Sequence, residues 1–75
     1  MKVVNITWED SRQIYGWTLE EDVDDSVCII NTVGYLIKET RNAYVVALSV
    51  GDNPKQYNGI NVIPKKCVIE CLTAE

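Results

Sequence analysis

The stretch at residues 26–50 constrains the fold more than any other part of this chain. Its apolar side chains recur at every second position, at Val33, Tyr35, Ile37, Tyr44, Val46, Leu48 and Val50. This spacing places side chains on one face of a pleated strand, whereas a helix would need a spacing of three or four. We therefore predict two long strands joined by a tight turn.

A turn centred on Arg41 and Asn42 sets the register of this predicted hairpin, because Asn tolerates the positive φ that tight turns require. The opposing pairs are then Glu39 with Tyr44, Ile37 with Val46, and Tyr35 with Leu48. Both apolar sets share one face in this register, and a slip of one residue would turn one set towards water. The other face mixes apolar and polar residues, which indicates that a strand, a helix or a second subunit covers it.

Three shorter strands are predicted outside the hairpin, at residues 2–8, 60–63 and 67–72. Turns are predicted at residues 51–54 and 57–59, which are rich in Gly, Asn, Asp and Pro. Pro64 ends the strand at residues 60–63 because it cannot donate a ladder hydrogen bond. A single tight turn at residues 64–66 then leads to the last strand, and residues 73–75 are expected to fray.

The segment between the first two strands carries helix signals and a run of acidic residues. One helical turn is predicted at residues 12–15, ended by Gly16. Residues 17–25 have Thr18 and Glu21 in the spacing of a capping box, followed by further acidic residues, so they form either a short helix or a solvated acidic loop. The spacing of the acidic residues lacks the twelve-residue pattern of a calcium loop, so no metal site is predicted.

Five short strands with a single-turn break between the last two are typical of one mainly β domain over residues 1–75. The predicted fold is a small five-stranded SH3-like or Sm-like barrel with one short helix or helical turn after the first strand. An OB-type barrel is the alternative, but the chain is short for it and the helix is misplaced. At 75 residues a single core is only marginally sufficient, so we expect a homo-oligomer that pairs strand edges or the mixed face of the hairpin.

Composition argues against several classes of function. Eleven acidic and seven basic residues give a net charge of −4, which disfavours nucleic acid as a partner. The chain has no histidine, and its three cysteines are predicted to be structural thiols, so no enzyme activity and no cofactor are expected. No apolar run could span a membrane and no secretion signal is recognised, which predicts a cytoplasmic protein without a membrane partner.

Aromatic and basic residues suggest one candidate binding site. If the loops at one rim of a barrel converge, Trp17 and Tyr57 could stack on a base while Lys55 or Lys65 meets its phosphate. The alternative is that Trp8 and Trp17 fill the core and that the lysines are ordinary surface residues.

Motifs spread over most of the chain occur in the order Val4-x-Ile6-x-Trp8-x-Asp10, Gly16-Trp17, Cys28, Gly34-Tyr35-Leu36, Val45-x-Ala47 and Gly59-x-x-x-Ile63-Pro64-Lys65-x-x-Val68. In this pattern the chain resembles a group of short proteins encoded in bacteriophage and prophage genomes. The resemblance implies a phage origin and an SH3-like or Sm-like barrel, and it implies no catalytic residue. Small phage barrels include virion accessory proteins, factors that bind one host protein, and proteins that sequester nucleotide signals.

The sequence and this resemblance together predict a non-enzymatic phage or prophage binding module in the bacterial host cytosol. Its ligand is expected to be a host protein or a small nucleotide. The alternatives are a virion structural or accessory protein and an Sm-like RNA-binding protein, the latter disfavoured by the negative charge.

Overall fold

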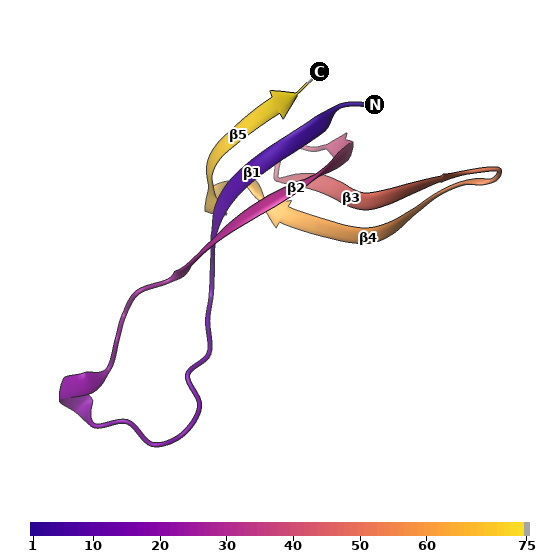
Figure 1. The fold of residues 1–75 in the computed structure, drawn as a ribbon. Helices are drawn as coiled ribbons and strands as arrows, with labels where there is room; N and C mark the ends of the chain where they lie inside the picture. Colours follow the sequence, from indigo (N-terminus) through magenta and orange to yellow (C-terminus); the bar gives the residue numbers. More distant parts are fainter. Residues whose placement is uncertain (75) are drawn as a thin grey trace.

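The computed structural model describes residues 1–74 as one antiparallel sheet of five strands (Figure 1). The strands are β1 (Val3–Asp10), β2 (Cys28–Glu39), β3 (Ala43–Asp52), β4 (Lys55–Pro64) and β5 (Val68–Ala74). The helical content of these residues is two single 3₁₀ turns, η1 (Glu20–Asp22) between β1 and β2, and η2 (Lys65–Cys67) between β4 and β5. The prediction of a mainly β fold of five strands is confirmed, whereas the ladders of these residues do not close into a barrel and the predicted helical element after the first strand is reduced to the 3₁₀ turn η1.

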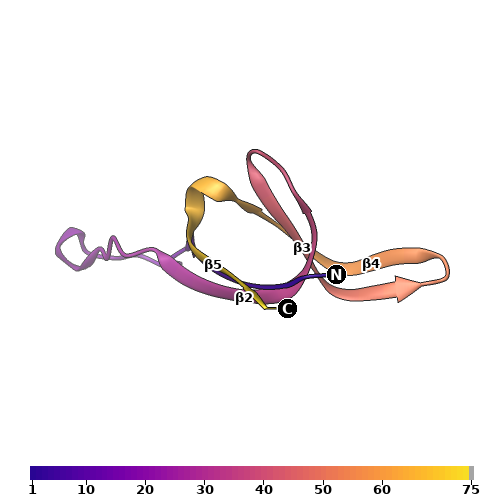
Figure 2. The ribbon, with the colours of Figure 1, turned by 90° about the horizontal axis from the view of Figure 1, so that it is seen from above.

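The sheet has the order β4-β3-β2-β1-β5 and curls strongly when it is viewed from above (Figure 2). Strand β2 makes the bend, because it pairs with β1 along residues 28–35 and with β3 from Tyr35 to Glu39. Strands β4 and β5 form the two edges, and within residues 1–74 no ladder joins them.

The core lies on the concave side of this sheet. Its fully buried members are Val4, Ile6, Val46 and Ile63, contributed by β1, β3 and β4. Partly buried side chains pack around them, namely Trp8, Leu36, Tyr44, Val68 and Cys71. Trp8 is therefore a core residue, and its indole Nε1 donates a hydrogen bond of 3.0 Å to Thr32 Oγ1 on the neighbouring strand.

The predicted register of the central hairpin is correct at the turn and wrong further along. Glu39 opposes Tyr44 as expected, but a bulge between Leu36 and Lys38 shifts the rest, so that Leu36 opposes Val46 and Tyr35 opposes Ala47. A bulge adds one residue to one strand and so reverses which side of it faces the core. For this reason Val33 and Tyr35 lie on the convex side, opposite to the predicted face.

Several strand limits also differ from the prediction. Strand β1 continues to Asp10, β5 continues to Ala74, and β4 already begins at Lys55. The turn predicted at residues 57–59 is wrong, because Gly59 lies within β4 and accommodates a φ of +70° there. The strand predicted to begin at Cys67 begins one residue later, because Cys67 belongs to η2.

The molecule is elongated, with principal extents of 54 × 23 × 20 Å. Two segments account for this shape: the β1–β2 connection and the far end of the β3–β4 hairpin project in opposite directions in both views (Figures 1 and 2). The hairpin turns at Asn53 and Pro54, as predicted, and Asn53 takes a φ of 127°. No helix within residues 1–74 has the length and apolar character needed to cross a membrane.

Candidate functional site

The β1–β2 connection at residues 11–27, hereafter the arm, is the most distinctive surface feature of the protein. Every residue in it is exposed, and its regular structure is the single turn η1. Connections of this length without secondary structure are uncommon in compact domains and are usually functional or disordered. In the ribbon the arm extends away from the sheet (Figure 1).

Short-range contacts give the arm its shape. Arg12 Nη2 lies 2.9 Å from Asp24 Oδ2, which links the outgoing and returning halves of the arm. The Ser26 amide donates a hydrogen bond of 2.9 Å to Asp24 Oδ1. The hydrogen bond from Ser26, followed by the contact with Arg12, lowers the pKa of the Asp24 carboxyl below 3.8. The arm therefore has defined local structure although it has no share in the core.

The helix signals in this segment are only partly realised. The helical turn predicted at residues 12–15 does not form. The capping box is wrong, because Leu19, and not Thr18, precedes η1 and no side chain caps it. The acidic run repels itself and has no packed face to hold a longer helix, so the solvated acidic loop is the correct alternative.

The arm concentrates both exposed apolar side chains and negative charge. Its large exposed apolar residues are Ile14, Tyr15, Trp17, Leu19, Val23 and Val27. It contains five acidic residues and one basic residue, whereas the rest of the chain contains six of each, so the entire net charge of −4 lies in the arm. Trp17 is fully exposed, which excludes it from the core. Trp and Tyr are enriched at protein interfaces, where they bury much area at low entropic cost.

The structure separates the residues of the predicted rim site. Trp17 is in the arm, whereas Lys55 and Tyr57 are in β4 beside the hairpin turn, at the opposite end of the molecule (Figures 1 and 2). Lys65 is in η2, which starts directly after β4. These four side chains do not surround one common site, so the predicted rim site is not formed and they cannot bind one ligand together.

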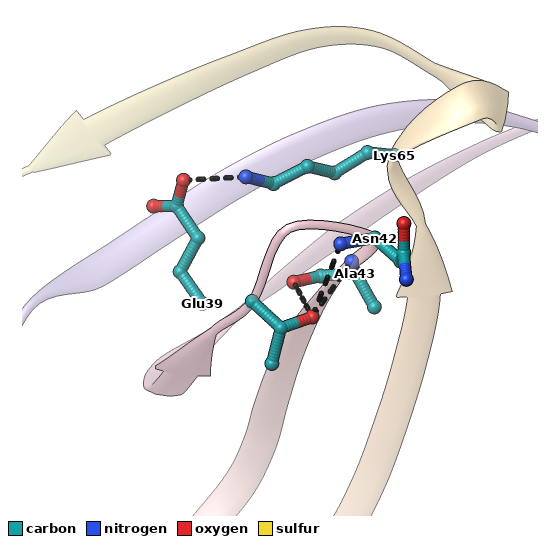
Figure 3. A network of polar contacts seen from close by, with 5 residues as sticks. Glu39, Asn42, Ala43 and Lys65 are labelled. Carbon is teal, nitrogen blue, oxygen red and sulfur yellow. Dashed lines mark hydrogen bonds and ion pairs between the residues drawn. The ribbon is translucent and has the colours of Figure 1, made fainter.

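Lys65 is part of a polar corner that joins η2 to the β2–β3 turn (Figure 3). Its Nζ lies 2.7 Å from Glu39 Oε2 and 5.0 Å from the centre of the Tyr44 ring. Its backbone amide donates a hydrogen bond of 2.8 Å to the Asn42 carbonyl. Thr40 Oγ1 accepts hydrogen bonds from the turn amides of Asn42 and Ala43, at 3.3 and 3.0 Å. The Lys65 ammonium is thus engaged in holding this corner together.

Tyr57 lies in an open concavity of about 370 Å³ on the β3–β4 hairpin. The lining residues are Ser49, Val50, Gly51, Gln56, Tyr57 and Asn58. They offer one aromatic ring and several hydrogen-bonding groups, but none of them is basic. A phosphate would find no cation in this lining, although nucleotide sites commonly pair stacking with a Lys or Arg.

The remaining candidates for chemistry are dispersed. The thiols of Cys28, Cys67 and Cys71 are free and partly buried. Across residues 1–74 no group of three or more His, Cys, Asp or Glu side chains is placed to hold a metal ion. The phenol of Tyr44 is perturbed, since burial, and then the neighbouring Cys71 and Glu39, raise its pKa above 10.

Sequence reasoning located the acidic run but missed the arm as a unit. The available signal was the lack of either apolar period across residues 11–27, combined with apolar residues that no predicted element could bury. Comparison of the chain with models of protein families, with curated proteins and with solved structures gives no match.

Proposed function

We propose that this protein is a non-enzymatic binding module of phage or prophage origin that binds a host protein through the arm. The observation that carries the proposal is the fully exposed Trp17, set among five other exposed apolar side chains on a segment with no share in the core. Clusters of exposed apolar side chains such as this one mark sites of interaction with other molecules. The bacterial host cytosol is the proposed place of action.

The charge of the arm suggests the chemistry of the partner. A segment with five acidic residues and one basic residue favours a partner surface with excess Lys or Arg around an apolar groove. The apolar residues would supply the binding energy, and the acidic ones would speed encounter and select against acidic surfaces.

A host protein is a better-supported ligand than a small nucleotide. The nucleotide hypothesis needs an aromatic residue and a cation at one place, but Trp17 and Lys55 lie at opposite ends of the molecule. The concavity around Tyr57 has no basic residue in its lining. The Lys65 ammonium is paired with Glu39.

The proposed architecture is a small SH3-like barrel that carries the arm as an insertion after its first strand. Its support is the order of the strands, the strong curl of the sheet and the single 3₁₀ turn between β4 and β5. Such a barrel provides a rigid base, so the binding segment can vary without altering the core.

The test is site-specific photo-crosslinking in bacterial cells that express the protein. A photoreactive phenylalanine analogue replaces Tyr15 or Trp17 in the arm, and Tyr57 in the hairpin serves as the matched control. We expect the same discrete host protein to be crosslinked from both arm positions and not from position 57. Crosslinks from position 57 alone, or none from the arm, would contradict the proposal.

A second variant tests the role of charge. Replacing Glu20, Glu21 and Asp22 by their amides keeps the size and shape of these side chains while removing three negative charges. The arm crosslink should then weaken several-fold and depend less on salt, because screening acts only on charged groups and three of the five acidic side chains of the arm are now neutral. An unchanged yield at low and high salt would show that charge does not select the partner.

A further inference from the structure

The protein exposes more surface than its mass predicts. Its accessible surface is 6073 Å², whereas a monomer of 8.5 kDa is expected to expose about 4,650 Å². Its radius of gyration is 15.9 Å, against about 11 Å for a compact domain of this length. The arm and the far end of the β3–β4 hairpin account for this extended shape, so less of the chain is left to build a core.

The core is correspondingly small. Five of residues 1–74 are buried, namely Val4, Ile6, Val46, Ala47 and Ile63. The cysteines are free, and the described residues hold no cluster suited to a metal, so neither common reinforcement of a small domain is in place. Oligomerisation is the other reinforcement, and a second copy of the chain is the one partner present wherever the protein is made.

The convex side of the sheet supplies an apolar surface for such a contact. Directly opposed residues share a face, and the ladders align Ala74, Val3, Tyr35, Ala47 and Ile60 in one row across all five strands. Val62 extends this row on one side, and Leu72 and Val33 extend it on the other. We define the convex stripe as Val3, Val33, Tyr35, Ile60, Val62 and Leu72. All but Val3 are among the exposed large apolar residues.

Three polar side chains beside the convex stripe are already paired with one another. Asn31 Nδ2 donates hydrogen bonds to Asn5 Oδ1 at 2.6 Å and to Thr7 Oγ1 at 3.1 Å. Polar groups with partners can enter an interface without the cost of an unsatisfied donor. The row formed by these residues is therefore compatible with burial against another protein.

Charges at the two ends of the convex stripe favour a second copy over an unrelated partner. Lys38 lies opposite Val45, in the row of Val62 at one end of the stripe, whereas Glu70 lies opposite Thr7, beyond Val33 and Leu72 at the other end. A two-fold axis that lies in the interface, perpendicular to the line from Lys38 to Glu70, exchanges the two ends of the stripe, so it brings Lys38 of each copy towards Glu70 of the other. The surface is thus complementary to itself, as an isologous interface requires.

We propose that two copies of the chain pack convex stripe against convex stripe about a two-fold axis. The two Lys38–Glu70 pairs flank the apolar contact, and both arms stay free. The interface is separate from the arm, so it does not depend on the function proposed above. It also leaves the edges of β4 and β5 unpaired, which distinguishes it from assembly by strand addition.

The test is the mass in solution of the full chain, measured by sedimentation equilibrium, with far-ultraviolet circular dichroism as the check of folding. At about 100 µM, where a standard-size interface is saturated, the native protein should be a dimer. Val33→Glu should weaken the dimer by about a hundredfold or more, since it buries an unpaired charge. The control Val23→Glu places the same charge on the arm and should leave the mass unchanged.

Charge reversal identifies the partner as a second copy. Lys38→Glu alone and Glu70→Lys alone should each weaken self-association by about tenfold or more, because like charges then face each other. Mixing the two variants should restore a dimer containing one of each, since both flanking pairs become attractive again. Lys66→Glu, outside the stripe, is the control and should keep the native mass.

Three results would overturn the proposal. The first is a native protein that is monomeric at about 100 µM, or that forms a ring of more than two copies, as pairing through strand edges would produce. The second is a dimer that survives Val33→Glu. The third is a pair of charge-reversal variants that dissociate, or unfold, and do not form a folded dimer when mixed.

Discussion

The carbonyl oxygen of Ala47 lies so close to Gly34 that a Cβ on Gly34 would be only 2.8 Å from it. This contact occurs where β2 leaves β3 and continues along β1 alone, so the bend of the sheet depends on a residue without a side chain. The obstructing atom belongs to the backbone of Ala47, which cannot move aside without breaking the hydrogen bonds between the strands.

Gly34→Ala should therefore lower the free energy of unfolding by about 1–3 kcal/mol, the usual cost of overpacking. Gly51→Ala is the matched control, because its Cβ would meet the flexible Gln56 side chain at 3.0 Å. We expect it to change stability by less than about 0.5 kcal/mol. Urea denaturation measures both, and equal losses would contradict the role given to Gly34.

The bond between Trp8 Nε1 and Thr32 Oγ1 should contribute measurably to the core. Thr32→Val keeps the shape but leaves the indole N–H without a partner, so we expect a loss of about 1 kcal/mol. In a Trp8→Phe background the same substitution should cost less, since no N–H is left unpaired. A double-mutant cycle by urea denaturation measures the coupling, and a coupling near zero would show that the bond is not stabilising.

Asp24 should titrate below 3.8 in the folded protein, because hydrogen bonds from Ser26, and then the contact with Arg12, favour its charged form. Because the pKa of Asp24 is lower in the folded protein than in the unfolded chain, ionised Asp24 stabilises the arm at pH values above its ordinary pKa. This stabilisation is lost as the pH falls through the lower pKa of the folded protein. NMR titration of the Asp24 carboxyl measures it. Ser26→Ala removes the contribution of the Ser26 hydroxyl but keeps that of its backbone amide, so it should raise the pKa part of the way towards 3.8, whereas Thr18→Ala should not change it. An Asp24 pKa at or above 3.8 would refute the contacts described.

Tyr44 should make the fold sensitive to alkali. Its pKa is raised above 10 by burial and by nearby Cys71 and Glu39, so the unfolded phenol loses its proton first. Stability should therefore fall as the pH rises from about 10 towards the folded value. Urea midpoints between pH 9 and pH 11 should fall less in Tyr44→Phe than in the native protein. Tyr15→Phe, in the exposed arm, should retain the native slope, and identical slopes in all three proteins would contradict the assignment.

The sequence predicted the strands well where alternation and turn chemistry agreed. The turn before Ala43 and the end of the strand at Pro64 could both be predicted, because each depends on the local conformation of one or two residues. The bulge at residue 37 could not be predicted, since nothing in the neighbouring sequence distinguishes this position from a regular strand. One undetected residue was enough to assign Val33 and Tyr35 to the wrong face.

The candidate site was harder to predict than the fold. Trp8 and Trp17 look alike in the sequence, as both sit close to apolar residues near the first strand. The structure buries one against Thr32 and leaves the other fully exposed. The difference depends on where the arm leaves the sheet, which is a matter of tertiary arrangement. The predicted rim site was wrong for the same reason. It required several loops to converge at one rim of a barrel, and in the curled sheet they do not converge.

The ladder between Val3 and Ala74 joins the two ends of the described chain. Strand β1 lies between β2 and β5, so its second neighbour is synthesised after all the other strands described here. Contacts between residues so distant in sequence form slowly, because a long loop must close first. The sheet therefore stays incomplete, with one edge of β1 exposed, until β5 has been synthesised. The unpaired edge of β1 is therefore the natural point of attack for a chaperone or for aggregation until β5 is added.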